Sequence, residues 1–129
     1  MAYYLSTTLK ADNISEVRTQ VAHALQSQGF GILTEIDIQA TMKKKLDKDY
    51  LPYLILGACH PQSADKALSA EPHMGVFLPC NVIIRDLGKN QFEVAAVDPV
   101  AAMSPAGKPE IEPMAGEIRG KLQAVLDQL

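Results

Sequence analysis

The sequence predicts one two-layer α+β domain, in which a largely antiparallel sheet carries two long helices on one face. Three observations support this fold class. The 129 residues suffice for a single domain, and 47% of them are hydrophobic while 21% are charged, as in ordinary globular proteins. Segments rich in β-formers alternate with segments of helical periodicity. Two of the helical segments are long and amphipathic, so each needs an apolar surface to cover.

The N-terminal elements are a strand and a long helix. Residues 2–10 contain Tyr, Thr and Leu without a helix signal and predict the first strand. Asn13 can cap the helix that follows, because Glu16 stands three residues later as in a capping box. Gly29 can end this helix, since glycine adopts the left-handed conformation at little cost. We therefore expect the first helix over about 13–28.

The middle of the chain predicts shorter elements. The alternation over 29–35 indicates a second strand, and Asp37 can then cap a short helix over 38–46. A third strand is expected over 50–56, where Pro52 indicates either an edge position or an irregular start.

The rest of the chain predicts a short helix, a hairpin and a second long helix. Pro61 suits the first turn of a helix over 61–70. Strands over 76–85 and 92–98 flank a hairpin loop, and an irregular stretch rich in proline follows. The last helix is expected from about residue 110 to the C-terminus.

Apolar side chains occur on both faces of several predicted strands. The two long helices can cover one face of the sheet, but the other face would then expose apolar surface to water. Because large exposed apolar patches usually mark binding surfaces, we expect a second subunit or a ligand to cover part of this face.

Charge and hydropathy exclude several classes of partner. Twelve Lys and Arg against fifteen Asp and Glu give a net charge of −3, which disfavours nucleic acids and anionic membranes as partners. The most apolar stretches, 51–59 and 74–84, are too short to cross a bilayer. The N-terminal segment lacks the pattern of a signal peptide, and two cysteines are too few for a disulfide framework. We therefore expect a cytoplasmic protein.

The strongest candidate for chemistry is the segment Gly-Ala-Cys-His-Pro at 57–61, where a predicted strand leads into a helix. Unpaired backbone N–H groups and the helix dipole favour negative charge at such a position, so they can stabilise the thiolate of Cys59, with His60 assisting. The functional interpretation is a reactive thiol or a soft ligand that binds a small molecule. The alternative is a small buried cysteine in a tight turn.

The segment Leu-Pro-Cys-Asn at 78–81 is the second candidate, because Pro79 and Asn81 interrupt an apolar strand around Cys80. An edge strand with a bulge would explain the same residues without a ligand. Asp98 precedes a proline, so it either orients a ligand or accepts backbone hydrogen bonds at the start of a turn.

A disulfide between the two cysteines is not expected within the hairpin. If the third and fourth strands are antiparallel neighbours, Cys80 lies opposite about Tyr53. Its sulfur is then on the order of 15 Å from that of Cys59. A disulfide needs Cα atoms closer than about 7 Å. A bridge across a dimer interface stays open.

A haem or metal site is one alternative function, and a purely structural dimerisation domain is the other. Three candidate ligands, Cys59, His60 and His73, flank the third helix. Met74 and Met103 are soft donors, but the spacing matches no zinc pattern. Solvent-facing histidines at helix ends would explain the same residues. The sequence holds no phosphate-binding glycine loop, carboxylate pair or base–nucleophile couple, so no enzymatic reaction is predicted.

Several segments together resemble a known family. They are GFGILTEID at 29–37, KKKL at 43–46, PY at 52–53, LGAC at 56–59, KAL at 66–68, LPCNV at 78–82 and DP at 98–99. This combination is similar to the bacterial and archaeal family called domain of unknown function 302, over nearly the whole chain. The resemblance implies a homodimer with a fold like that of the TATA-box-binding protein, in the order β-α-β-β-β-β-α. It does not imply DNA binding, because function resides in sites and not in folds.

The chain also departs from the family pattern at the candidate site. Many relatives have Asn at the position of His60, and other branches lack both cysteines. Thiol chemistry would therefore belong to one branch. Some branches are suspected of binding haem or sulfur compounds, which keeps the haem alternative open here.

Overall fold

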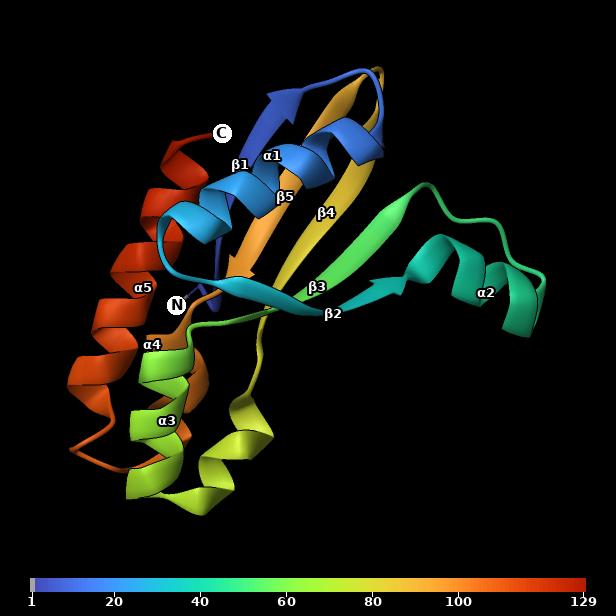
Figure 1. Cartoon of the computed structure of the whole chain (residues 1–129). Helices are drawn as coiled ribbons and strands as arrows, with labels where there is room; N and C mark the ends of the chain where they lie inside the picture. The colour runs from blue at the N-terminus through green and yellow to red at the C-terminus, as the bar shows by residue number, and fades with distance from the viewer. Residues whose placement is uncertain (1) are drawn as a thin grey trace.

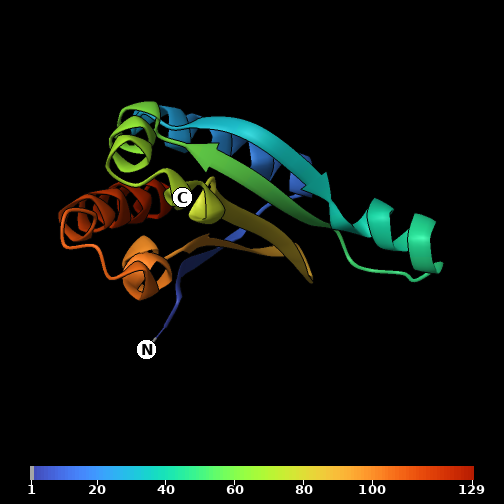
Figure 2. The same cartoon turned by 90° about the horizontal axis from the view of Figure 1, so that it is seen from below.

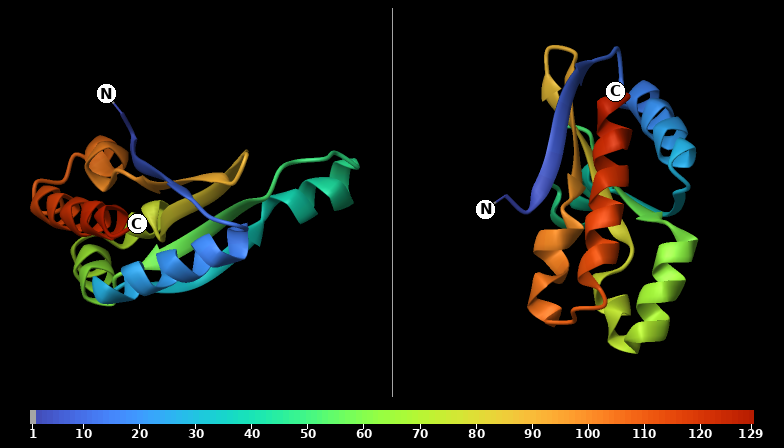
Figure 3. Two further views of the ribbon diagram at one scale, coloured as in Figure 1. Left: turned by 90° about the horizontal axis from the view of Figure 1, so that it is seen from above. Right: turned by 90° about the vertical axis from the view of Figure 1, so that its left-hand side faces the viewer.

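The computed structural model describes residues 2–129 and contains a five-stranded antiparallel sheet with the order β1-β5-β4-β3-β2 (Figure 1). The strands are β1 (Tyr4–Lys10), β2 (Gly31–Asp37), β3 (Tyr53–Cys59), β4 (Cys80–Gly88) and β5 (Gln91–Val97). The long helices α1 (Ile14–Ser27) and α5 (Glu112–Asp127) lie side by side on one face of the sheet (Figure 3). The predicted two-layer α+β class and the order of its elements are therefore confirmed.

Short helices lie at two ends of the molecule. They are α2 (Ile38–Leu46), α3 (Pro61–Ala70), α4 (Pro99–Met103) and the 3₁₀ helices η1 (Pro72–Phe77) and η2 (Ser104–Ala106). Helices α3, η1 and α4 gather below the end of the sheet where β3 ends, whereas α2 stands apart from all other helices (Figures 1 and 2). Across residues 2–129, no helix has the length and apolar character needed to span a membrane.

The predicted helix caps form. The Asn13 side chain accepts a hydrogen bond from the Glu16 N–H at 2.9 Å, and Asp37 accepts one from the Ala40 N–H at 2.9 Å. Gly29 follows α1 with a φ of 85°, in the left-handed region that glycine adopts readily. These local signals explain why α1 and α2 begin within one residue of the positions that the sequence predicts.

Two strands begin three or more residues later than predicted. The third strand begins at Tyr53, three residues later than expected, and it lies between β2 and β4. Pro52 therefore marks an irregular start, and its edge interpretation is wrong. The fourth strand begins only at Cys80, because residues 72–77 form η1. Glu71 caps this 3₁₀ helix by accepting a hydrogen bond from the His73 N–H, which favours a turn over an extended chain.

The stretch after β5, expected to be irregular, contains α4 and η2. Asp98 caps α4 by accepting hydrogen bonds from the backbone N–H groups of Val100 and Ala101. The same cap geometry explains why Pro99 begins a helix here, since proline is tolerated in a first turn.

The apolar side chains form two separate cores. The main core lies between the sheet and the helices α1 and α5; its fully buried members include Val17, Leu25, Leu56, Val82, Ile84, Val94 and Leu122. The small core lies among α3, η1, α4 and α5. Its buried members are Ala67, Met74 and Ile111, with Phe77, Met103 and Met114 packed around them.

No element within residues 2–129 covers the second face of the sheet, which we call the open face (Figures 1 and 3). Its side chains come from the alternate positions of each strand and include Tyr4, Tyr53 and Ile83. Tyr4 keeps 43% of its surface exposed. The expected second subunit or ligand on this face stays a prediction.

Candidate functional site

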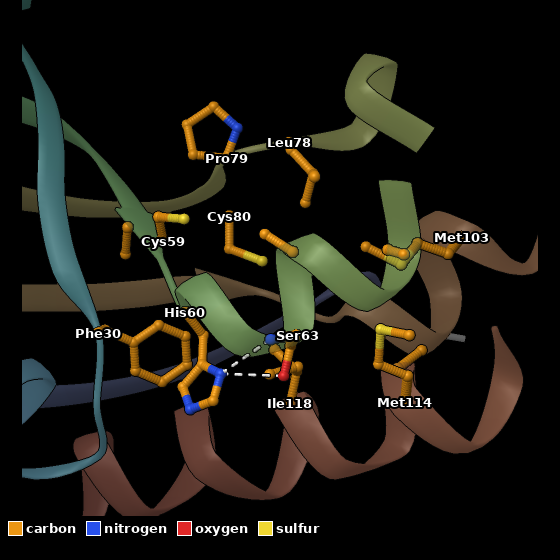
Figure 4. Close-up of a pocket in the computed structure, with 14 residues that line it drawn as sticks. Phe30, Cys59, His60, Ser63, Leu78, Pro79, Cys80, Met103, Met114 and Ile118 are labelled. Carbon is orange, nitrogen blue, oxygen red and sulfur yellow. Dashed lines mark hydrogen bonds between the residues drawn. The ribbon is translucent and has the colours of Figure 1, made fainter. Parts of the chain in front are cut away.

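A narrow cleft lies where the main core meets the small core, and it receives both cysteines (Figure 4). Its walls come from the end of β3, the start of α3, the segment before β4, and α5. Most of the lining is apolar; it includes Phe30, Ala58, Ala64, Ala67, Leu78, Pro79, Met103, Met114, Ala115 and Ile118. The free volume is about 30 Å³, which is room for roughly two water molecules. A larger ligand would need the walls to separate.

Cys59 sits at the predicted turn between a strand and a helix. It is the last residue of β3, directly opposite Gly31 of β2, and its side chain is half-buried. His60 and Pro61 follow at once and begin α3. The cysteine is thus held at the edge of the main core and lines the cleft.

His60 is fixed by contacts on three sides. Its Nδ1 accepts a hydrogen bond from the Ser63 N–H at 3.4 Å and lies 2.9 Å from the Ser63 Oγ. Its ring packs edge-on against Phe30, with 5.4 Å between the ring centroids. A Cβ atom at Gly29 would lie 3.1 Å from Nε2, so the chain passes close to the ring there. Because Nδ1 accepts, this arrangement fits a neutral imidazole that carries its proton on Nε2.

The cap on α3 changes the predicted role of the histidine. We expected free N–H groups at this helix start to stabilise the Cys59 thiolate. The His60 ring takes the Ser63 N–H instead. His60 therefore orients the first turn of α3, and Ser63 is a functional neighbour that sequence reasoning missed. Its spacing of three residues after the cap was the available signal.

Cys80 has a different environment from Cys59. It is the first residue of β4, lies opposite Ala58 and belongs to the main core. Burial, together with the negative charge of a Cys59 thiolate, raises the pKa of Cys80 to about 11. Cys80 therefore stays protonated at neutral pH and is a poor nucleophile. Both cysteines are free thiols.

The expected separation of the sulfurs, on the order of 15 Å, rests on a register that is wrong. Tyr53 pairs with Arg85, and Cys80 pairs with Ala58, the residue next to Cys59. The error follows from η1, which delays the start of β4 and shifts its register against β3. The two cysteines consequently line one cleft.

Gly57 allows the segment before β4 to approach β3. A Cβ atom at this position would lie 2.2 Å from the Thr34 Oγ1 and 2.7 Å from the Pro79 Cγ. Both distances are shorter than any normal contact, so no larger residue fits without movement. Gly57 thus holds Pro79 and, with it, Cys80 at the cleft, although the sequence indicated only a strand boundary there.

Asp98 lies away from the cleft. Besides capping α4, it accepts a hydrogen bond at 3.0 Å from the Nε of Arg119 on α5. Burial alone would raise the pKa of Asp98, but the hydrogen bonds from Arg119, Ala101 and Val100 outweigh it and hold the pKa below its usual value. Its position fits the structural alternative, an acid that accepts backbone hydrogen bonds.

The remaining predicted site residues are scattered. Asn81 is exposed on the open face and lines a broad hollow there. His73 is exposed on η1, with its Nδ1 2.8 Å from the Glu71 carboxylate. Met103 does line the cleft, at the end opposite the cysteines and beside Met114 (Figure 4). Met114 was missed as a site residue because it belongs to the apolar stripe of the last helix.

The sulfur atoms of the cleft do not form one compact donor set. Cys59 and Cys80 lie at one end and Met103 and Met114 at the other (Figure 4). Within the part of the chain that the structure describes, no three His, Cys, Asp or Glu side chains are arranged to hold a metal ion. The cleft is thus an elongated apolar space with a thiol end and a thioether end.

The sequence matches the family model of the Domain of unknown function DUF302 over residues 5–129. The chain belongs to the DUF302 family. The crystal structure of an uncharacterized conserved DUF302 protein from Bacillus stearothermophilus is similar to it, with a TM-score of 0.89 and 22% sequence identity. The similarity covers 99% of this chain and 98% of that chain, so the two DUF302 proteins share their fold. No curated protein matches the sequence.

Proposed function

We propose that this DUF302 domain binds a small apolar ligand through the cleft between its two cores, with the Cys59 thiol as the group that contacts or modifies the ligand. The observation that carries the proposal is the position of Cys59, a half-buried thiol at the end of an apolar, sulfur-lined cleft. Ligand pockets are typically apolar with few polar groups, as here.

The two cysteines have separate roles in this proposal. Cys59 is the more accessible thiol and reacts first. Cys80, with a pKa of about 11, remains a neutral thiol that lines the inner wall. Two free thiols also fit a reducing compartment such as the cytoplasm, which we propose as the location of the protein.

Ligand entry requires the cleft to widen beyond its resting volume of about 30 Å³. The small core can give way more easily than the main core, because only Ala67, Met74 and Ile111 are buried in it. Two methionines, Met103 and Met114, line its side of the cleft, and unbranched methionine side chains repack readily. We therefore assign the opening to a movement of α3 and α4 away from the sheet.

Haem or metal binding, the alternative function, has weaker support. His73 lies outside the cleft, and the cysteines and methionines are at opposite ends of it. An elongated apolar molecule with a thiol-reactive end fits this arrangement better than a single ion.

We propose further that the domain acts as a homodimer. The support is the open face of the sheet, where apolar side chains such as Tyr4 and Ile36 keep 43% and 47% of their surface exposed. Two copies that associate through this face would remove that surface from water.

The ligand proposal is tested by the rates at which alkyl methanethiosulfonates modify Cys59. In this reaction the thiolate attacks the sulfenyl sulfur, a mixed disulfide forms, and methanesulfinate leaves. Each rate is divided by the rate of the same reagent with free glutathione. On this scale the butyl reagent should react about tenfold faster than the anionic sulfonatoethyl reagent. The reason is that burying about two methylenes in the cleft contributes roughly 1.6 kcal/mol. Rates are measured by mass spectrometry at pH 7.5.

Three variants control this experiment. Cys59→Ala should abolish the fast reaction, and Cys80→Ala should keep it. Ala64→Met, on the partly exposed wall of the cleft, should remove the preference for the butyl reagent while circular dichroism shows an intact fold. The proposal would be overturned if the unmodified protein showed the same ratio of butyl to sulfonatoethyl rates as free glutathione. It would also be overturned if the reaction were lost in Cys80→Ala alone.

A further inference from the structure

The segment that projects from the sheet at α2 contributes no buried residue to either core of its own chain. We call residues 38–52 the arm; it consists of α2 and the link to β3. The burial pattern of α2 includes no buried residue. Figures 1 and 2 show the arm beyond the body of the molecule, at a distance from α1, α3 and α5.

Several polar contacts hold the arm together. Asp37 caps α2, the Gln39 side chain donates a hydrogen bond to the Tyr50 carbonyl at 2.9 Å, and Lys43 bridges Asp47 and Asp49. A helix of nine residues is marginal in water without a packed face. Because no residue of α2 is fully buried, the helix has less of the apolar packing that normally stabilises such an element.

The arm also exposes apolar side chains. Leu46 and Leu51 are 67% and 60% exposed, and Tyr50 is 38% exposed. Ile36, at the end of β2, is 47% exposed on the open face and connects this apolar surface with the sheet. Exposed apolar side chains therefore occur both on the arm and on the adjoining end of the open face.

A hollow of about 460 Å³ lies on the open face, toward the opposite edge of the sheet from the arm. Its lining includes Tyr3, Tyr4, Tyr53, Ile83, Ala95 and Val97. Arg85 and Glu93 also line the hollow, but they pair with each other, so covering them leaves no uncompensated charge.

The size of the open face can be compared with the area that a dimer needs. Five strands of about seven residues give a face of roughly 550 Å² at the usual strand spacings. Stable interfaces bury about 800 Å² on each partner. The roughly 550 Å² is a projected area, which the accessible surface of a corrugated face exceeds, so the sheet alone reaches about the size of a standard interface. The exposed arm adds further apolar surface to it.

We infer that the arm of one chain packs into the hollow on the open face of a second copy of this chain, and that the exchange is reciprocal about a two-fold axis. In such an arrangement each copy presents the same two surfaces, arm and hollow, to its partner. This inference rests on the proposed homodimer and adds the contact that forms it. It is independent of the cleft at Cys59.

The test uses sedimentation velocity of the full chain at 1–100 µM, a working range chosen around typical dimer affinities of about 1 µM. The unmodified protein should be a dimer. An arm variant, Leu46→Asp with Leu51→Asp, and a hollow variant, Tyr4→Asp, should each raise the dissociation constant at least about tenfold. Val76→Asp, on η1 and 82% exposed, is the matched control and should leave the dimer intact.

Mixing the arm variant with the hollow variant distinguishes an exchanged arm from any other dimer. The mixed dimer regains one intact contact, between the normal arm of the hollow variant and the normal hollow of the arm variant. Association should therefore recover on mixing. If the unmodified protein stays monomeric, the proposed homodimer itself is overturned. If the arm variant has an unchanged dissociation constant, only the arm contact is overturned. The same holds if the arm variant and the hollow variant do not associate on mixing.

Discussion

The main core and the small core differ in how many residues hold them together. In the main core, alternating residues of the strands pack against two long helices, and members such as Leu56, Ile84 and Leu122 have no exposed surface. The small core has three buried members, supplied by α3, by η1 and by the turn before α5. The cleft lies between the two. The wall that the main core supplies, with Cys80, is therefore the more rigid one, and the wall that the small core supplies can move more easily. A site that its ligand opens needs one such movable wall.

The largest effect should come from a cavity in the main core. Ile84→Ala on β4 should lower the free energy of unfolding by about 3–5 kcal/mol, the usual cost of truncating a fully buried isoleucine. Met74→Ala, its counterpart in the small core at 1% exposure, should cost only about 2 kcal/mol because fewer buried neighbours surround it. Urea unfolding followed by circular dichroism measures both.

Hydrogen exchange shows whether the two substitutions destabilise different regions of the molecule, in addition to lowering the free energy of unfolding by different amounts. Met74→Ala should speed exchange in α3, η1 and α4 while β4 and β5 stay protected. Ile84→Ala should speed exchange throughout the sheet. Equal and uniform losses in the two variants would mean that the cores unfold as one unit, and the proposed opening of the cleft would lose its basis.

The same division explains what the sequence could predict. Both long helices and all five strands of the main core follow from hydrophobic periodicity and from a cap such as Asn13, because each of these signals is local. The small core is built from proline-rich segments. There Pro72 and Pro99 begin helical turns that depend on side-chain caps from Glu71 and Asp98, and periodicity over five or six residues is too short to reveal them.

The candidate site was predicted only in part for a related reason. The strand-to-helix turn at Cys59 and His60 is visible in the sequence, because glycine and proline mark it. The position of Cys80 beside it depends on the register between β3 and β4, and this register is set by the length of η1. Register is a long-range property. Because the sequence did not predict η1, the predicted position of the Cys80 thiol was wrong.

Gly57→Ala probes the junction between the two cores and should have an intermediate effect. The new methyl group would meet Thr34 and Pro79, so we expect a loss of about 1–3 kcal/mol, typical of overpacking. Gly31→Ala is the matched control on the neighbouring strand, where an added Cβ meets nothing within 4 Å. Gly31→Ala should be neutral or slightly stabilising. Equal effects in thermal unfolding would show that Pro79 does not press on β3.

The smallest effect should come from the contact that ties α4 to α5. Asp98→Asn keeps a side chain that can cap α4 but removes the charge that attracts Arg119, which is 45% exposed. At pH 7 we expect a loss below about 1 kcal/mol, since exposed partners contribute little. Glu117→Gln, an exposed change two residues before Arg119 on α5, controls for altered net charge.

The pH dependence of Asp98→Asn follows from the lowered pKa of Asp98 in the folded state. A carboxyl whose folded pKa lies below its unfolded value of about 3.9 stabilises the fold above that pH. Its contribution is lost as the pH falls toward the folded pKa, because the proton then binds in both states. The difference between the unmodified protein and Asp98→Asn in urea unfolding should therefore be constant from about pH 5 to 7 and shrink below about pH 4. If the difference in the free energy of unfolding grows on acidification, burial and not Arg119 determines the direction in which the pKa of Asp98 is shifted. In that case apolar contacts alone would anchor α4 to α5.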